Sequence, residues 1–265
     1  MAFDYLAGTA ANLVTGATIT ASSEDTNYDA DNVGVGWPAK PFRFNAAAAD
    51  DTLDFDFASA KQPTLVSLHG HNIDSGITSV TVLSDDNSSF TSPVTEDTIA
   101  FADISSPTVY TTIAAPTSHR YWRFKFNGTN GAAIEIGEAV MGVKSSLTRA
   151  QLIDWKIGIK RPQSRQTGAG VPQVFASNLS DFHQRTLSLS FVATDYDERD
   201  EIDALFTATA FGEQPFICVP DSGDSIVIHG RLPSEYEWER IPGPSGGYHR
   251  TSFTVEEDPF TVGLT

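Results

Sequence analysis

Residues 119–142 read HRYWRFKFNGTNGAAIEIGEAVMG, and this stretch decides the fold class. Side chains alternate between the two faces of a β-strand, so its first half places every second aromatic residue on one face. The residues on that face are Trp122, Phe124 and Phe126. The turn residues 127–131 follow, and a second alternating run covers 133–140. The pattern predicts two late strands with an aromatic core face, the second carrying Glu138 among apolar neighbours.

The chain before this stretch is predicted to be built of strands alone. Residues 53–57 alternate apolar and acidic side chains, which is typical of a half-buried strand. The further predicted strands are 19–23, 64–68, 79–83, 99–101 and 110–113. Turn signals separate them at the spacing expected of an antiparallel β-sandwich.

Several short motifs in this half stand in a characteristic order. They are Ala21-Ser22-Ser23, Asp31-Asn32 before Trp37, Leu53–Phe57, Val66–Gly70, Val82–Asp86, Tyr121–Arg123 and Ile136–Glu138. Together they resemble the discoidin-type (F5/8 type C, galactose-binding-like) jelly roll over about residues 10–143. The sequence His71-Asn72-Ile73 resembles the version of this module found in bacteriophage tail proteins.

The second half predicts a different domain, so we expect one domain at 1–145 and another at 146–265. Alternating strands at 154–160 and 185–193 flank a long loop at 161–181. One helix is predicted at about 196–210, because Ile202, Leu205 and Phe206 form an apolar stripe and acidic residues fill the first turn. The fold class is therefore mainly β, with one helix in the second domain.

This second half resembles the tail-tube-like domain of long-tailed bacteriophage tail proteins, including the minor tail and distal tail families. The matching segments are Gly212–Ile217, Ile226–Gly230 and Tyr248–Glu257, within about residues 148–258. The resemblance implies assembly into a ring of identical subunits near the tail tip.

Composition excludes several classes of function. The chain has 265 residues and a formal net charge of −17, which disfavours nucleic-acid binding because that needs a basic surface. Its single cysteine, Cys218, cannot form an internal disulfide, and we expect it to be a buried apolar residue. The sequence contains neither a signal-peptide pattern nor an apolar run of 18 residues, so no membrane insertion is expected.

The discoidin resemblance implies a structural Ca²⁺, held by oxygen ligands of the kind that suit a hard cation. The matching positions are Asp29, Asp31 and Asn32 in a loop and Glu138 in a strand. The alternative is that the loop acids are solvated and that Glu138 pairs with Arg123 or Arg120.

The same resemblance implies glycan binding at loops on one end of the sandwich. The candidate contact residues are Trp37, Phe42, Arg43, His71 and Asn72. The alternative is that the aromatic residues fill the core beneath a long loop and that Asn72 holds a turn through hydrogen bonds to the backbone.

Three arginines in or beside the long loop suggest an assembly contact, because an extended basic arm can bind the acidic face of a neighbour. They are Arg161, Arg165 and Arg185, and the alternative is an ordinary loop. The sequence contains no Gly-x-Ser-x-Gly motif and no phosphate-binding loop, so we expect no enzyme activity.

The main hypothesis is a structural virion protein of a long-tailed bacteriophage, made in the host cytoplasm and located in the tail. Its expected partners are other tail proteins and copies of itself in a ring. The alternative hypothesis is a carbohydrate-binding module that recognises host-surface glycans. A glycan-active enzyme is the third hypothesis, and the catalytic residues for it are not evident in the sequence.

Overall fold

The structure is a computed structural model that describes most of the chain. The described residues are 3–7, 11–35, 40–104, 108–147, 151–160, 163–168, 171–176, 184–219, 227–242 and 248–257, with backbone only for 151, 159–160, 163–168, 171–176 and 184. Mainly β structure with one helix is confirmed for these residues.

The first part of the chain forms a sandwich of two antiparallel sheets. The five-stranded sheet has the order β2 (Thr18–Ala21), β4 (Thr52–Lys61), β9 (His119–Gly128), β6 (Ile77–Asp85) and β7 (Val94–Ala100). The four-stranded sheet has the order β3 (Phe42–Arg43), β10 (Glu135–Gly142), β5 (Leu65–His71) and β8 (Thr108–Thr112). Short 3-10 turns connect them: η2 (Leu13–Gly16), η3 (Ala30–Gly34) and η4 (Phe101–Asp103).

The aromatic face of β9 lies in the core of this sandwich, as its alternation predicts. Trp122, Phe124 and Phe126 are fully buried. Phe55 on β4 lies opposite Trp122, and Val82 on β6 lies opposite Phe124. Burial of each such side chain contributes on the order of 2 kcal/mol, so this central strand anchors the sandwich.

The four-stranded sheet is buried on both of its faces. Every residue of β5 and of β10 is buried, whereas β4 alternates between buried and partly exposed positions along its first six residues. Val66 and Leu68 face the sandwich core, while Leu65 and Val140 belong to a second apolar cluster with Ile217. The outer face of this sheet is therefore covered by the second half of the chain.

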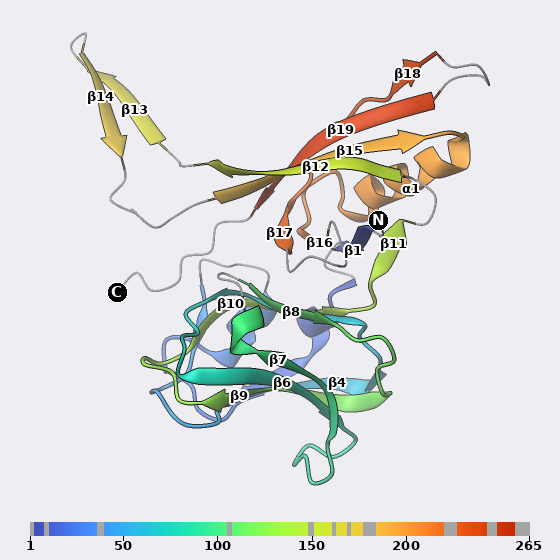
Figure 1. Cartoon of the computed structure of the whole chain (residues 1–265). Helices are drawn as coiled ribbons and strands as arrows, with labels where there is room; N and C mark the ends of the chain where they lie inside the picture. Colours follow the sequence, from blue (N-terminus) through green and yellow to red (C-terminus); the bar gives the residue numbers. More distant parts are fainter. Residues whose placement is uncertain are drawn as a thin grey trace.

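An eight-stranded antiparallel sheet lies outside the sandwich, against the outer face of its four-stranded sheet (Figure 1). Its order is β11 (Ser145–Leu147), β1 (Phe3–Ala7), β16 (Phe216–Val219), β17 (Ile228–Arg231), β19 (Tyr248–Glu257), β15 (Gln184–Ala193) and β12 (Gln151–Lys160), and β18 (Glu239–Ile241) also pairs with β19. The sequence predicts that residues 1–145 form the sandwich, yet β1 pairs with β16. This pairing joins residues more than 200 positions apart, so no local pattern indicates it.

Helix α1 (Tyr196–Ala208) packs on the eight-stranded sheet. The Asp195 side chain accepts a hydrogen bond from the Glu198 N–H at 2.9 Å and so caps the N-terminus. Phe206 is buried and its ring lies edge-on to Phe253 of β19 at 5.0 Å. The helix ends before Gly212, whose φ of +85° favours glycine.

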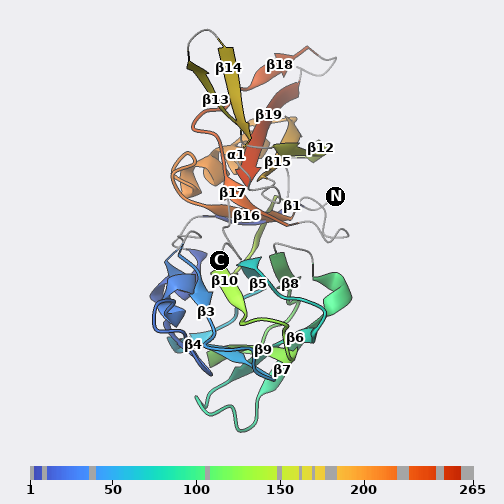
Figure 2. The ribbon, with the colours of Figure 1, turned by 90° about the vertical axis from the view of Figure 1, so that its left-hand side faces the viewer.

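The segment predicted as a long loop at 161–181 contains a β-hairpin. β13 (Gln163–Gly168) and β14 (Val171–Ala176) pair antiparallel as a separate two-stranded sheet. Both views show this hairpin projecting away from the eight-stranded sheet (Figures 1 and 2). The prediction of a loop here was wrong, because β13 is polar and β14 contains Pro172, so neither shows the regular apolar alternation on which strand prediction depends.

Among the described residues, no helix has both the length and the apolar character needed to span a membrane.

Candidate binding site

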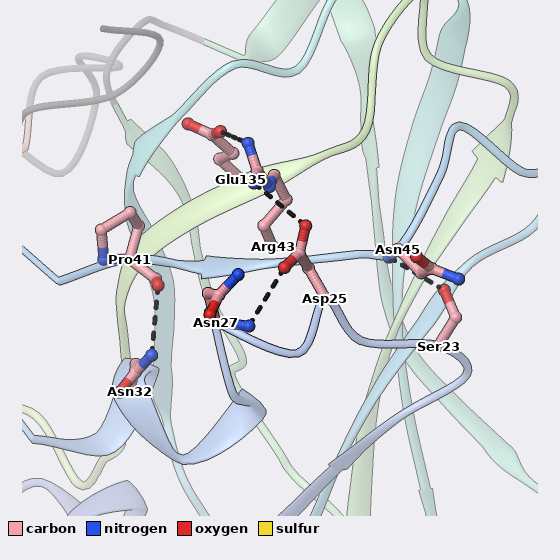
Figure 3. Close-up of polar contacts among 8 residues, drawn as sticks. All are labelled: Ser23, Asp25, Asn27, Asn32, Pro41, Arg43, Asn45 and Glu135. Carbon is pink, nitrogen blue, oxygen red and sulfur yellow. Dashed lines mark hydrogen bonds and ion pairs between the residues drawn. The ribbon is translucent and has the colours of Figure 1, made fainter. Parts of the chain in front are cut away.

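A cluster of polar side chains surrounds Arg43 at one end of the sandwich (Figure 3). Arg43 lies on the short strand β3, directly opposite Glu135 at the start of β10. The Asp25 N–H donates to the Arg43 carbonyl at 3.0 Å, and the Arg43 N–H donates to the Tyr28 carbonyl at 3.2 Å. These backbone bonds hold the 25–28 turn beside Arg43, and the pairing of β3 with β10 brings the start of β10 to the same arginine.

The Arg43 guanidinium bridges two carboxylates. Its Nη2 lies 3.0 Å from Asp25 Oδ2, and its Nη1 lies 3.3 Å from Glu135 Oε1. The guanidinium carbon also lies 4.1 Å from the centre of the Tyr28 ring, within the range of a cation–π contact. The side chains of Arg43, Asp25 and Glu135 are 22%, 23% and 10% exposed, so solvent reaches the cluster.

The Arg43 guanidinium is held in its charged form. Partial burial would lower the pKa of Arg43, but hydrogen bonding to Asp25 and attraction to Asp25, Tyr28 and Glu135 outweigh it and raise that pKa. The carboxylate of Asp25 also accepts a hydrogen bond from the Asn27 N–H at 3.1 Å. The site therefore presents a fixed cation between two anions.

His71 and Asn72 lie beside this cluster, as two of the predicted glycan contacts. The Asn72 Oδ1 accepts from the Glu135 N–H at 2.8 Å, and its Nδ2 donates to the Ala133 carbonyl at 2.9 Å. Asn72 thus holds the start of β10 through the backbone. Burial lowers the pKa of His71 to about 4, against an opposing hydrogen bond with the Thr108 backbone. His71 is therefore neutral at physiological pH.

The prediction that Phe42 contacts a glycan was wrong. Trp37, another predicted contact, lies outside the described residues. Phe42 has no exposed surface and its ring packs edge-on to Phe44 at 4.7 Å in the sandwich core. A ring without exposed surface cannot stack on a sugar. The alternating pattern places Phe42 and Phe44 on one side of the chain and Arg43 on the other.

The predicted calcium ligands lie in two different settings. Asp29 and Asp31 are exposed beside η3, and the Asn32 amide is buried and donates Nδ2 to the Pro41 carbonyl at 3.2 Å (Figure 3). Glu138 instead faces the second domain. No group of three His, Cys, Asp or Glu side chains suited to a metal occurs within the described residues. Calcium binding, which also uses carbonyl oxygens, stays a prediction.

Glu138 pairs with a histidine of the eight-stranded sheet. Its Oε2 lies 3.1 Å from His229 Nε2 on β17, and both side chains are 2% exposed. The alternative partners were wrong, because Arg120 binds Asp56 and Arg123 binds Asp54, each at 2.6 Å on the other sheet. Sequence alone could not identify His229, because it follows Glu138 by 91 positions and lies in another domain.

The three predicted assembly arginines are described to different extents. Arg161 lies outside the described residues, and only the backbone of Arg165, on β13, is described. Arg185 binds Glu257 within the same sheet, with Nε 2.9 Å from Oε1, and its Nη2 donates to the Val227 carbonyl at 3.1 Å. Arg185 is thus paired within its own sheet, and its part in an assembly contact stays a prediction.

Sequence reasoning missed most residues of the Arg43 cluster. Asp25, Asn27 and Tyr28 lie in a polar stretch, and Glu135 lies inside the strand predicted at 133–140, but neither feature indicates that they meet. The cluster combines a guanidinium donor, two carboxylate acceptors and an aromatic ring, which together match polar ligands with several hydroxyl groups.

No protein-family model matches the chain, and no curated protein matches it. Several solved structures that are similar to about half of the chain are carbohydrate-binding modules. One is chitosan-binding module 2 in complex with chitotriose, derived from a chitosanase/glucanase from Paenibacillus sp. IK-5, with 16% identity over 49% of this chain and 99% of that chain and a TM-score of 0.43.

Two further similar structures also carry sugars. The family 32 module of C. perfringens NanJ in complex with galactose has 12% identity over 53% of this chain and 99% of that chain, with a TM-score of 0.42. The lectin domain of lectinolysin complexed with Lewis B antigen has 12% identity over 50% of this chain and 96% of that chain, with a TM-score of 0.40.

Proposed function

We propose that this protein binds carbohydrate through its β-sandwich, at the Arg43 cluster formed by Asp25, Asn27, Tyr28, Arg43 and Glu135. The observation that carries the proposal is the partly exposed guanidinium fixed between two carboxylates and against a tyrosine ring. The hydrogen-bond donors and acceptors of the Arg43 cluster lie at the loop end of the sandwich. Ligands can reach them there, and the rigid sheets hold them in place.

The chemistry of the cluster suits sugar hydroxyls. A hydroxyl group both donates and accepts, so it can bridge a carboxylate oxygen and a guanidinium N–H that lie side by side. Exposed ion pairs contribute about 1 kcal/mol or less to stability, so the fold gains little from this arrangement itself. The fixed positions of these groups are therefore better explained by ligand binding than by a contribution to stability.

The experiment is a glycan array probed with the full chain at high protein concentration. Binding to one related group of glycans is the expected result, with the signal abolished by free competing sugar. The absence of any glycan signal from a folded sample would refute the proposal.

A second candidate function is a structural subunit of a bacteriophage tail, located in the virion and assembled as a ring. The observation that favours assembly is the β13–β14 hairpin, which projects from the body as a separate two-stranded sheet (Figure 1). Hairpins of this kind offer unpaired edges to a neighbouring chain.

Replacing residues 163–176 by a short glycine-serine linker tests this second function. Analytical ultracentrifugation should show that the full chain self-associates whereas the deletion variant stays a folded monomer. Equal association of the two proteins would contradict an assembly role for the hairpin.

Calcium binding near η3 is a further proposal, supported by the exposed oxygen donors of Asp29 and Asp31. A structural ion should raise the thermal midpoint when Ca²⁺ is added, and a chelator should lower it. A midpoint that neither reagent changes would argue against the ion.

A further inference from the structure

Strand β12 forms one edge of the eight-stranded sheet. Within the described residues it pairs only with β15, so backbone N–H and C=O groups along its other side face away from the sheet. β12 has ten residues, whereas β11 at the opposite edge has three, and the sandwich edges β7 and β8 have seven and five. A long edge of this kind is a template on which another strand can pair.

The apolar core of the sheet continues to this edge. Trp155 lies opposite the buried Leu189 in the β12–β15 pair, and it packs partly buried against the core beneath α1. Ile157 lies opposite the buried Leu187 and is itself 38% exposed. The apolar face of the sheet thus ends at β12 with part of its surface uncovered, and a further strand beside β12 would bury that surface.

The other face of β12 carries one charge of each sign. Asp154 and Lys156 lie opposite two serines of β15, and their side chains are 57% and 79% exposed. The Lys156 Nζ lies 3.6 Å from the Asp154 Oδ2, in an exposed ion pair that contributes little to the fold. From Ile153 to Ile157 the sequence therefore runs apolar, acidic, aromatic, basic, apolar.

This order is complementary to itself when two copies of the strand run antiparallel. If the two Trp155 residues lie opposite one another, each Asp154 lies opposite the partner's Lys156, which is a favourable cross-strand pair. The same register places each Ile153 opposite the partner's Ile157. The bulge of β12 lies between Leu152 and Asp154, so the regular part of the strand includes the charged centre.

Other registers lose this complementarity. A shift by one residue places the charged side chains opposite Trp155 and the isoleucines. A shift by two residues places Asp154 opposite the partner's Asp154, or Lys156 opposite the partner's Lys156, and like charges directly across two strands repel. The charges therefore favour a single alignment.

We propose that the protein forms a two-fold dimer through antiparallel pairing of β12 with the β12 of a second copy, centred on Trp155. The pairing supplies partners to the backbone groups of the edge and covers Trp155 and Ile157. It joins the two eight-stranded sheets into one continuous sheet. A two-fold contact uses the same patch on both copies, so it leaves no β12 edge for a third copy.

The dimer contact is distinct from the two sites proposed above. The Arg43 cluster lies on the sandwich, and the β13–β14 hairpin follows β12 as a separate two-stranded sheet (Figure 1). The contact needs no sugar, so its test is independent of carbohydrate binding. A dimer carries two Arg43 clusters and would bind a ligand with repeated sugar units more tightly than one copy does.

The test is sedimentation velocity of the full chain over a range of concentrations, in which monomer should give way to dimer as the concentration rises. Two charge reversals change only exposed side chains. Asp154→Lys places lysine opposite lysine in the dimer, and Lys156→Asp places aspartate opposite aspartate. Either variant alone should raise the dissociation constant about tenfold, because two attractive pairs become two repulsive ones.

Combining the two reversals should restore the dimer. An equimolar mixture of Asp154→Lys with Lys156→Asp places each introduced charge opposite one of the other sign, so mixed dimers should form where neither variant dimerises alone. The double variant, with both substitutions in one chain, should dimerise as the unmodified protein does. Asp103→Lys is the matched control, because it changes the net charge equally at an exposed position of the sandwich and should leave the dimer unchanged.

A full chain that stays monomeric at high micromolar concentration would overturn the proposal. Single variants that dimerise as the unmodified protein does, or a mixture that dimerises no better than the single variants, would also overturn it. The variant in which a linker replaces residues 163–176 retains β12, so it should still form the dimer. A monomeric deletion variant beside a self-associating full chain would assign the association to the hairpin and contradict the β12 contact.

Discussion

Glu135 and Glu138 lie three positions apart on the same strand, β10, and have opposite surroundings. Glu135 meets Arg43 of its own domain at a loop end that solvent reaches. Glu138 meets His229 on β17 of the eight-stranded sheet, where both side chains are almost fully buried. The same type of side chain on one strand thus belongs to the proposed binding site at one end and to the contact with the eight-stranded sheet at the other.

The difference follows from where water is available. At the loop end a broken ion pair can be solvated, so its partners are available to bind another polar molecule at low cost to the fold. At the domain contact a carboxylate that loses its partner remains buried and uncompensated. We therefore expect mutations at the buried end to change stability, and mutations at the loop end to change binding.

Removal of the Glu138 partner should have the largest effect on stability. His229→Ala leaves the buried carboxylate without its contact at 3.1 Å, and should lower the free energy of unfolding by about 3–5 kcal/mol. Urea denaturation at neutral pH measures this loss in the free energy of unfolding. His249→Ala is the matched control; a loss as large as that of His229→Ala would show that histidine replacement in this sheet, rather than the ion pair, causes the effect.

Acidification should have the next largest effect, and it sharpens the comparison because His71 lies near the Glu135 end of the same sheet. The pKa of His71 is about 4 in the folded protein and about 6.5 when exposed, so the unfolded chain binds more protons in acid. Stability from this residue is full above pH 6.5 and falls by roughly 3 kcal/mol towards pH 4.

Urea midpoints recorded across this pH range measure the acid effect, and His71→Gln should flatten the curve over the same interval. If the curve of that variant matches the curve of the unmodified protein, His71 does not carry the predicted proton linkage.

Arg43→Ala should cost the fold about 1 kcal/mol or less, because its ion pairs are partly solvated. The thermal unfolding of Arg43→Ala is compared with that of Arg120→Ala. This control variant loses a comparable surface ion pair with Asp56. A loss of more than about 3 kcal/mol for Arg43→Ala alone would place the loop end in the same class as the buried contact.

Asp25→Asn should have the smallest effect on stability, about 0.5 kcal/mol or less. Asparagine keeps the side-chain oxygen that accepts from the Asn27 N–H, and loses only the charge that attracts Arg43. Chemical denaturation can set an upper limit on this loss of stability. A change in sugar affinity of the same variant would show that the Asp25 charge contributes to binding.

Much of the sandwich could be predicted because its strands alternate. Trp122, Phe124 and Phe126 are core residues, and Cys218 is buried, as the sequence indicates. The cap at Asp195 also follows from local chemistry that is visible in a short window.

Contacts between distant segments could not be predicted in the same way. The pairing of β1 with β16 and the contact of Glu138 with His229 each join segments that lie far apart in the sequence, so neither leaves a local pattern. The Arg43 cluster combines a turn with two strand ends, and only the fold brings them together. Phe42 was misassigned because an aromatic residue beside Arg43 has the same composition signal whether it faces the core or the solvent.

Calorimetric titration with a glycan selected on the array tests the central claim most directly. The full chain, Arg43→Ala and Arg120→Ala should all be folded, and the account predicts binding by the full chain and by Arg120→Ala. It predicts at least a tenfold loss of affinity for Arg43→Ala, equivalent to about 1.4 kcal/mol. Equal affinity of all three proteins would contradict a carbohydrate site at the Arg43 cluster.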